Sequence, residues 1–405
     1  MTILTDYHHF DGRHHDTGPI RNILAYQGAP APHTGKPLSE AMLLGISGGI
    51  TVGYFTFAYQ GLDPHLALLT RNTFDPVETI FERLALPREV LQTSKPDTAQ
   101  QNLIKVLENG QPALVWADAY SLSYNQMPFA DKMWMMLPLV VYGVEDETAY
   151  LADRSNQPLC VPLSELTQAR GRIKEDKYRI ITLDAPNMEK LASAVQKGIW
   201  QCISLYTDMP PKGKRDNFGF AALENWANLL VNTRNKQSWE RFFPAGCSMY
   251  VALAGNRIQP GAFDWICTWS GAGSAERGSY ADFLDEAALL LNKPDLSHAA
   301  AQFRQAGAAW DAFANALLPD SVPVFKETRD LKLRRHHLFI EQGSAAREEI
   351  AACNLRLGEI VDAMRDQFPL SAAEAATFRE ALRDHVLNIL AIEREAVSML
   401  SEAIS

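Results

Sequence analysis

The spacing of apolar residues divides the chain into two parts that meet near residue 185. In the first part, short runs rich in β-branched and aromatic residues alternate with polar turns, which is typical of strands. Helical spacing is rarer there and predicts helices over 18–27, 75–84 and 98–109. The first part is therefore expected to be α+β. Its expected strands are PALVWAD (112–118), LPLVVYGV (137–144), TAYLAD (148–153) and KYRIITL (177–183).

After residue 185, apolar residues recur every three or four positions, as they do on one face of a helix. Two long helical segments are predicted beyond Pro323, at about 325–366 and 372–403. Ser371 and Glu374 form a capping-box pattern that marks the start of the second segment. We expect the two segments to pair as an antiparallel hairpin. Its apolar stripe would pack on the rest of the chain or on a second copy, giving a homodimer.

These changes of pattern predict three domains. An α+β domain is expected at 1–185, a mostly helical domain at 186–322, and the C-terminal helical hairpin at 323–405. The chain has 405 residues, of which 47% are apolar, so it can bury more than one core.

Composition narrows the class of function. The formal net charge of -10 argues against a nucleic-acid partner, because binding phosphates needs a basic face. The five cysteines are scattered with no CxxC motif, which favours a reducing compartment over a disulfide framework. The most apolar run, at 133–144, is too short to span a bilayer, and the N-terminus has no secretion-signal pattern. We therefore expect a cytoplasmic protein that does not act on nucleic acid or in a membrane.

Several separate motifs resemble one known family. The stretch PLSEAMLLGISGGITVGYF (37–55), preceded by GRHHDTGPIRNILAYQG, resembles the N-terminal domain of the butirosin biosynthesis protein H family. The segments ENWANLL, KQSWERFF and GAGSAERGSYADFLDEAALLL resemble the helical domain of unknown function that usually follows it. The resemblance covers about residues 8–320. It implies a papain-like first domain and the transfer of an aminoacyl group from an acyl carrier protein to an amine in specialised metabolism.

The resemblance also implies which residues carry the chemistry. In the family, a cysteine at the start of the first helix attacks the thioester, and a histidine on a facing strand activates it. Here His14 matches the histidine that precedes the cysteine in the family, but His15 stands at the position of the cysteine itself. Leu137 takes the place of the strand histidine, whereas Asp153 matches the acidic residue that orients it. No histidine occurs between His65 and His298, so the activating base is missing in any register.

Three interpretations remain open. In the first, a neutral His15, steered by Asp16 or His14, acts as general base for an attacking amine. Acyl transfer or cyclisation would then proceed without a covalent enzyme intermediate or a cofactor, on a small-molecule or carrier-tethered intermediate that contains an amine. In the second, the chain is a pseudoenzyme that binds or presents such an intermediate or its carrier protein.

The third interpretation is a metal-dependent enzyme. Imidazole and carboxylate side chains that suit zinc or iron are gathered near the N-terminus, at His8, His9, His14, His15 and Asp16. Adjacent histidines on a strand point to opposite faces, so at most one residue of each pair would reach a common ion. We therefore expect no bound metal.

Further residues are candidates for contacts with the substrate. The glycine-rich GISGGIT lacks the lysine of a phosphate loop, so its glycines are expected to allow a tight backbone path beside the cleft. Arg277 is the candidate for binding an anionic group such as a carrier phosphopantetheine, with packing between domains as the alternative. The full set of candidates comprises Ser47, Gly48, Gly49, Asp118, Tyr120, Tyr124, Leu137, Arg277 and Tyr280.

Overall fold

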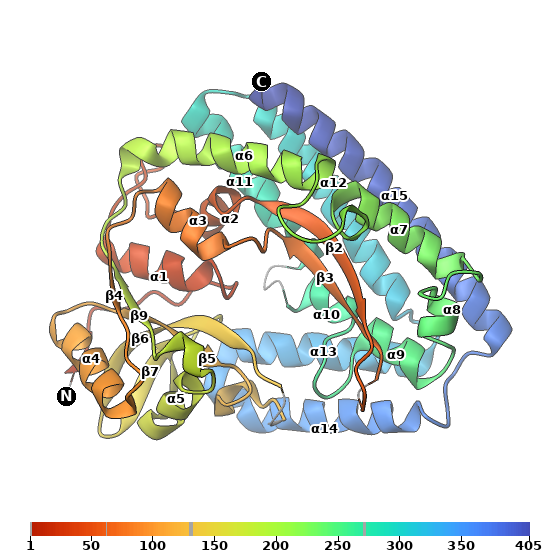
Figure 1. The fold of residues 1–405 in the computed structure, drawn as a ribbon, viewed down its shortest axis with the longest axis horizontal. Coiled ribbons are helices and arrows are strands. Elements are labelled where there is room, and N and C mark those ends of the chain that lie inside the picture. Colours follow the sequence, from red (N-terminus) through yellow and green to blue (C-terminus); the bar gives the residue numbers. More distant parts are fainter. Residues whose placement is uncertain (1, 62, 129–132, 270–272) are drawn as a thin grey trace. The chain divides into compact units, whose positions relative to one another are not determined.

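The structure is a computed structural model that describes residues 2–61, 63–128, 133–269 and 273–405 (Figure 1). The chain forms two compact units, each built from three stretches. Unit 1 comprises Met1–Leu43, Ile80–Leu191 and Arg335–Asn354, and unit 2 comprises Leu44–Thr79, Ala192–Arg334 and Leu355–Ser405. The linear three-domain division expected from the sequence stays a prediction.

Unit 1 is built on an antiparallel sheet. Its strands follow the order β4-β9-β5-β6-β7-β8, and β1 pairs with β6 beside this row. All residues of β6 from Pro138 to Val144 are buried, which matches the continuous apolar run in the sequence. Asp146 and Glu147 form the tight β6–β7 turn with φ of 46° and 62°. The strands are β1 (Thr2–Ile3), β4 (Arg88–Leu91), β5 (Ala113–Asp118), β6 (Met136–Glu145), β7 (Thr148–Ala152), β8 (Leu159–Pro162) and β9 (Ile180–Leu183).

Three helices of unit 1 pack on this sheet: α1 (Gly18–Gln27), α4 (Pro96–Glu108) and α5 (Leu163–Arg170). Pro19 stands in the first turn of α1, and Gly28 ends the helix in the left-handed conformation at φ 71°. Helix α1 packs against β6. It therefore positions the residues just before Gly18 close to the central strands of the unit. Two further helices lead from one unit into the other, α2 (Glu40–Ile46) and α3 (Pro76–Arg83).

Unit 2 is mostly helical around one strand pair, β2 (Ile50–Phe57) and β3 (His65–Arg71). Its core contains Trp226 of α7, which stacks on Tyr54 of β2 with ring centroids 5.1 Å apart. The β2–β3 pair is not among the strands expected from the sequence. The helices are α6 (Leu191–Thr207), α7 (Gly219–Val231), α8 (Trp239–Phe242), α9 (Cys247–Ala254), α10 (Ala262–Cys267), α11 (Arg277–Leu291) and α12 (Asp295–Leu317).

The C-terminal region contains three helices, where two long segments were expected. The first segment is divided into α13 (Pro323–Gln342) and α14 (Arg347–Ala363) by a short 3₁₀ turn. Gly343 starts this turn with φ 53°, a conformation that a continuous helix cannot contain. The last segment is α15 (Ala372–Ile404), and its capping box is confirmed, since the hydroxyl of Ser371 accepts from the amide of Glu374.

The apolar stripe of α15 packs on α12 and α7 of the same chain. Association through the C-terminal helices stays a prediction. The architecture, a sheet domain in the N-terminal part and a helical C-terminal region, confirms the predicted α+β class. Among the described residues, no helix combines the length and the apolar composition that crossing a membrane requires.

Candidate functional site

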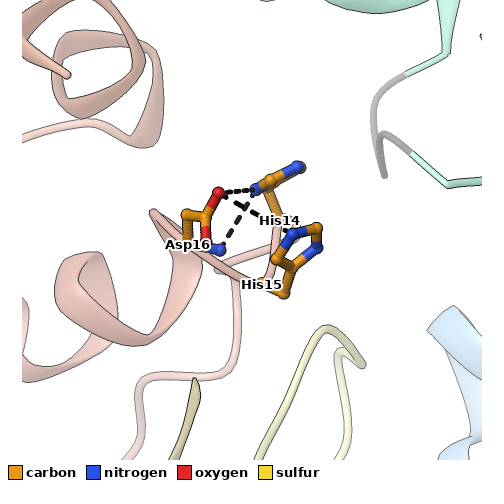
Figure 2. A group of neighbouring side chains, drawn as sticks. All are labelled: His14, His15 and Asp16. Carbon is orange, nitrogen blue, oxygen red and sulfur yellow. Dashed lines mark hydrogen bonds and ion pairs between the residues drawn. The ribbon is translucent and has the colours of Figure 1, made fainter. Parts of the chain in front are cut away.

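His14, His15 and Asp16 lie together in the turn that leads into α1, with Asp16 beside both imidazoles (Figure 2). The amide of Gly18 donates to the carbonyl of His14 at 2.7 Å, which closes the turn. The two imidazole rings are only 3.9 Å apart, with an angle of 32° between their planes. The expectation that strand geometry separates this pair was wrong, because the residues form a turn and not a strand.

The carboxylate of Asp16 lies beside both imidazoles (Figure 2). Its Oδ2 lies 3.8 Å from Nδ1 of His14 and 3.7 Å from Nε2 of His15. The backbone amide of Asp16 donates to Nδ1 of His14 at 3.1 Å. Since Nδ1 accepts this hydrogen bond, it carries no proton of its own. The side chain of His14 is 6% exposed and that of His15 is 17% exposed, so solvent reaches the second histidine more readily.

Glu40, which was not predicted from the sequence, fixes the conformation of this turn through hydrogen bonds. Its carboxylate accepts the amides of Arg13 at 2.7 Å and His14 at 2.8 Å. It also accepts the hydroxyl of Thr17 at 2.8 Å. Three donors on one carboxylate fix the path of the chain around the histidines. The only signal in the sequence was a glutamate in the PLSEAM motif, more than twenty residues along the chain.

Leu137 and Asp153 lie on neighbouring strands of unit 1. Leu137 is the second residue of β6, the strand on which α1 packs, and Asp153 directly follows β7, which pairs with β6. The turn of His15 therefore precedes the helix that contacts the strand of Leu137. The resemblance implies that these three positions face one another, and that closer arrangement stays a prediction. The catalytic roles of the residues stay predictions.

The carboxylate of Asp153 accepts hydrogen bonds from two neighbouring side chains. Arg154 donates to both of its oxygens, at 2.7 Å from Nε and 2.9 Å from Nη2. The hydroxyl of Tyr124 donates to Oδ2 at 2.8 Å. Burial raises the pKa of Tyr124 well above its usual value, and the charge of Asp153 raises it further, so the phenol stays a donor. Asp153 is thus held in a buried network with a cation.

Asp118 fixes the chain that follows β5. Its carboxylate is fully buried and accepts the amide of Met135 at 2.8 Å and the hydroxyl of Ser121 at 2.7 Å. The guanidinium of Arg172 lies 3.7 Å away. Burial raises the pKa of the nearby Tyr120 to about 12. These contacts explain the burial of Asp118 by local structure, and its expected role in substrate binding stays a prediction.

Ser47, Gly48 and Gly49 lie in unit 2, in the bend between α2 and β2. The hydroxyl of Ser47 donates to the carbonyl of Leu44 at 2.7 Å, and the side chain is fully buried. Gly48 and Gly49 have φ of 110° and 71°, so both use the left-handed freedom of glycine. The tight backbone path expected here is confirmed. Contact with a substrate stays a prediction.

Arg277 and Tyr280 are both fully buried in unit 2. Nε of Arg277 pairs with Glu393 of α15 at 2.7 Å. The other nitrogens of this guanidinium donate to backbone carbonyls and to the hydroxyl of Tyr206 at 2.9 Å. An anionic ligand would therefore have to displace Glu393 to reach Arg277. The anion-binding role stays a prediction that requires this pair to open.

The turn, the helix and the strands described above fall within one family match. The family model of the butirosin biosynthesis protein H N-terminal domain matches residues 14–154. The match begins at His14 and ends at Arg154, so it contains the histidine turn, β6 and Asp153. None of the curated proteins matches the chain. The family match associates residues 14–154 with a family of antibiotic and natural-product biosynthesis.

Proposed function

We propose that this protein forms an amide on an amine-containing biosynthetic intermediate, by acyl transfer or cyclisation, without a cysteine nucleophile. The observation that carries the proposal is the position of His15. It stands at the start of α1 in the family domain, with its Nε2 3.7 Å from the carboxylate of Asp16. An imidazole beside a carboxylate is the usual arrangement of a general base and the group that orients it.

In the proposed reaction, His15 accepts a proton from the attacking amine. The nitrogen of the amine bonds to the acyl carbon, and the carbon–sulfur bond of a carrier-bound thioester breaks. The proton on His15 then passes to the leaving thiolate, so that the reaction is balanced without an oxidant or a covalent enzyme intermediate. The positive end of the α1 dipole favours the negative charge that develops on the acyl oxygen.

The proposed substrates follow from this chemistry. One is an acyl group held as a thioester, most naturally on an acyl carrier protein, and the other is an amine in the same or a second molecule. None of the chain's five cysteines lies in the histidine turn, which supports a route without a thiol. The alternative is a pseudoenzyme that uses the same turn only to bind or present the intermediate.

A single-turnover assay tests the proposal. The full-length protein is incubated with a panel of acyl-carrier thioesters and amines, and amide formation is followed by mass spectrometry. We expect His15→Gln to slow the reaction by roughly 10²- to 10⁴-fold, the usual value of positioned acid–base catalysis. A wild-type protein that binds the thioester but gives no amide would favour the pseudoenzyme. An unchanged rate in His15→Gln would exclude His15 as the base.

A further inference from the structure

We propose that His14, His15 and Asp16 together bind one divalent late transition-metal ion, with Zn²⁺ as the representative case. Each residue offers one ligand atom, and all three atoms lie within 4.8 Å of one another. Two imidazoles and one carboxylate form a ligand set that zinc commonly uses. The inference goes beyond the proposed function, because it concerns ion binding and not amide formation.

The spacing of the side chains supports a site of this kind. Nδ1 of His14 and Nε2 of His15 are 3.8 Å and 3.7 Å from Oδ2 of Asp16. Both distances exceed the roughly 3.2 Å limit of a good N–H···O hydrogen bond. Ligands held at about 2.0–2.2 Å in a tetrahedral site stand roughly 3.3–3.6 Å apart. These two separations exceed that value by a few tenths of an ångström, and all three ligand atoms lie within 4.8 Å of one another. The side chains would therefore have to move closer together to hold an ion.

The protonation of His14 also suits a metal. A metal ligand must be an unprotonated nitrogen, and Nδ1 of His14 is in that state because it accepts the amide of Asp16 at 3.1 Å. Binding would exchange this hydrogen bond for a metal–nitrogen bond. The imidazole itself would keep its place, since the amide of His14 remains held by Glu40.

The surroundings of the turn reduce the cost of binding a cation. The positive end of the α1 dipole opposes a cation here. Two negative charges, on Asp16 and on the Glu40 carboxylate that holds the turn, offset it. Gly12 and Gly18 pack so closely that a Cβ at either would clash with the backbone of the other segment, which keeps the turn in one conformation. A rigid loop loses less entropy when it binds an ion.

Three protein ligands would leave a fourth position of a tetrahedral ion open. In the reaction proposed above, Asp16 faces Nε2 of His15, which leaves Nδ1 to accept the proton of the amine. An ion bound to Nε2 and Asp16 would withdraw electron density from the ring and make Nδ1 a weaker base. The ion would therefore inhibit the reaction proposed above if that reaction is correct. For this reason the test measures binding and leaves activity out, so that the two proposals fail or succeed separately.

The experiment titrates the full-length, EDTA-treated protein with Zn²⁺ by calorimetry and with Co²⁺ by visible absorption. We expect about one ion per chain and the intense bands of low-coordinate, nitrogen-ligated Co²⁺. His15→Asn and Asp16→Asn should each weaken binding by roughly tenfold or more. Asparagine has nearly the same shape as aspartate, so Asp16→Asn still tests the proposal if the histidine variant fails to fold.

Two control variants remove histidine pairs outside the turn. His8→Asn with His9→Asn, and His336→Asn with His337→Asn, should leave the affinity unchanged. Circular dichroism and thermal unfolding confirm that each variant is folded. Binding that survives Asp16→Asn, or that is lost in a control, would overturn the proposal. No uptake by the wild-type protein would also overturn it and would leave an ion pair between imidazolium and Asp16 as the explanation of the spacing.

Discussion

Both oxygens of Asp153 accept hydrogen bonds from the guanidinium of Arg154, at 2.7 Å and 2.9 Å. Asp153 is the residue that the resemblance assigns to orient a catalytic histidine. The resemblance places that histidine at Leu137 of β6, so this chain would have no histidine for Asp153 to orient. The carboxylate is paired with the adjacent cation instead. Arg154 in turn lies over the ring of Phe339, 5.2 Å from its centroid, in the part of α13 that belongs to unit 1.

This pairing leads to a prediction about restoring a thiol nucleophile. In His15→Cys alone, only His14 and the dipole of α1 can stabilise the thiolate, so its reaction with iodoacetamide at neutral pH sets the reference rate. His15→Cys with Leu137→His should react faster, since an imidazole beside a thiol keeps part of it as thiolate. Adding Arg154→Gln should raise the rate again by releasing Asp153 to orient the new histidine. Equal alkylation rates in the single and double variants would show that position 137 does not face the turn.

A second prediction concerns Glu40. Glu40→Ala removes the acceptor of two amides and one hydroxyl in a partly buried turn. Leaving such donors unpaired costs about 1–3 kcal/mol in the free energy of unfolding. Urea titration measures this loss, with Glu89→Gln on the exposed surface of β4 as the control. Glu40→Gln should lose less, because the amide oxygen still accepts. A Glu40→Ala protein as stable as the control would mean that the turn does not depend on the hydrogen bonds to Glu40.

The third prediction concerns the thiols. Burial raises the pKa of both Cys202 and Cys267 to about 12, so neither forms much thiolate at neutral pH. Cys160 is exposed on β8. Iodoacetamide at neutral pH should therefore modify Cys160 first, as peptide mass spectrometry would show, and it should leave any amide-forming activity largely intact. Loss of activity in step with labelling of Cys202 would contradict the route without a thiol nucleophile.

The sequence predicted the parts of the fold that depend on local patterns. Helix α1 was expected over 18–27 and covers Gly18–Gln27, because a proline at the start and a glycine at the end limit it. Strands β5, β6, β7 and β9 were expected within a few residues of their observed bounds, since their apolar runs are bounded by turn residues. The break between α13 and α14 was missed, although Gly343 was a local signal for it.

The candidate site was less predictable, because it depends on contacts between distant segments. Glu40 reaches the histidine turn across 26 residues of chain, and no periodic pattern encodes that contact. The strand pair of β2 and β3 was missed, although the run ITVGYFTF of β2 is rich in β-branched and aromatic residues and only Gly53 interrupts it. The likeness to a family located His15, Leu137 and Asp153, but it could not show that Asp153 is paired with Arg154.

The last prediction concerns the buried pair of Arg277 and Glu393. Both side chains are fully buried, and Trp310 also donates to Glu393, at 2.7 Å. Glu393→Leu leaves the Arg277 cation without its counter-charge, which should cost about 3–5 kcal/mol in the free energy of unfolding. Replacing both, Arg277→Met with Glu393→Leu, should recover most of this loss, because no unpaired charge remains. Urea unfolding of the two variants decides between two roles. Recovery in the double variant would identify the pair as a packing element of unit 2, whereas a stable Glu393→Leu protein would show that Arg277 finds another anion, as the carrier-binding role requires.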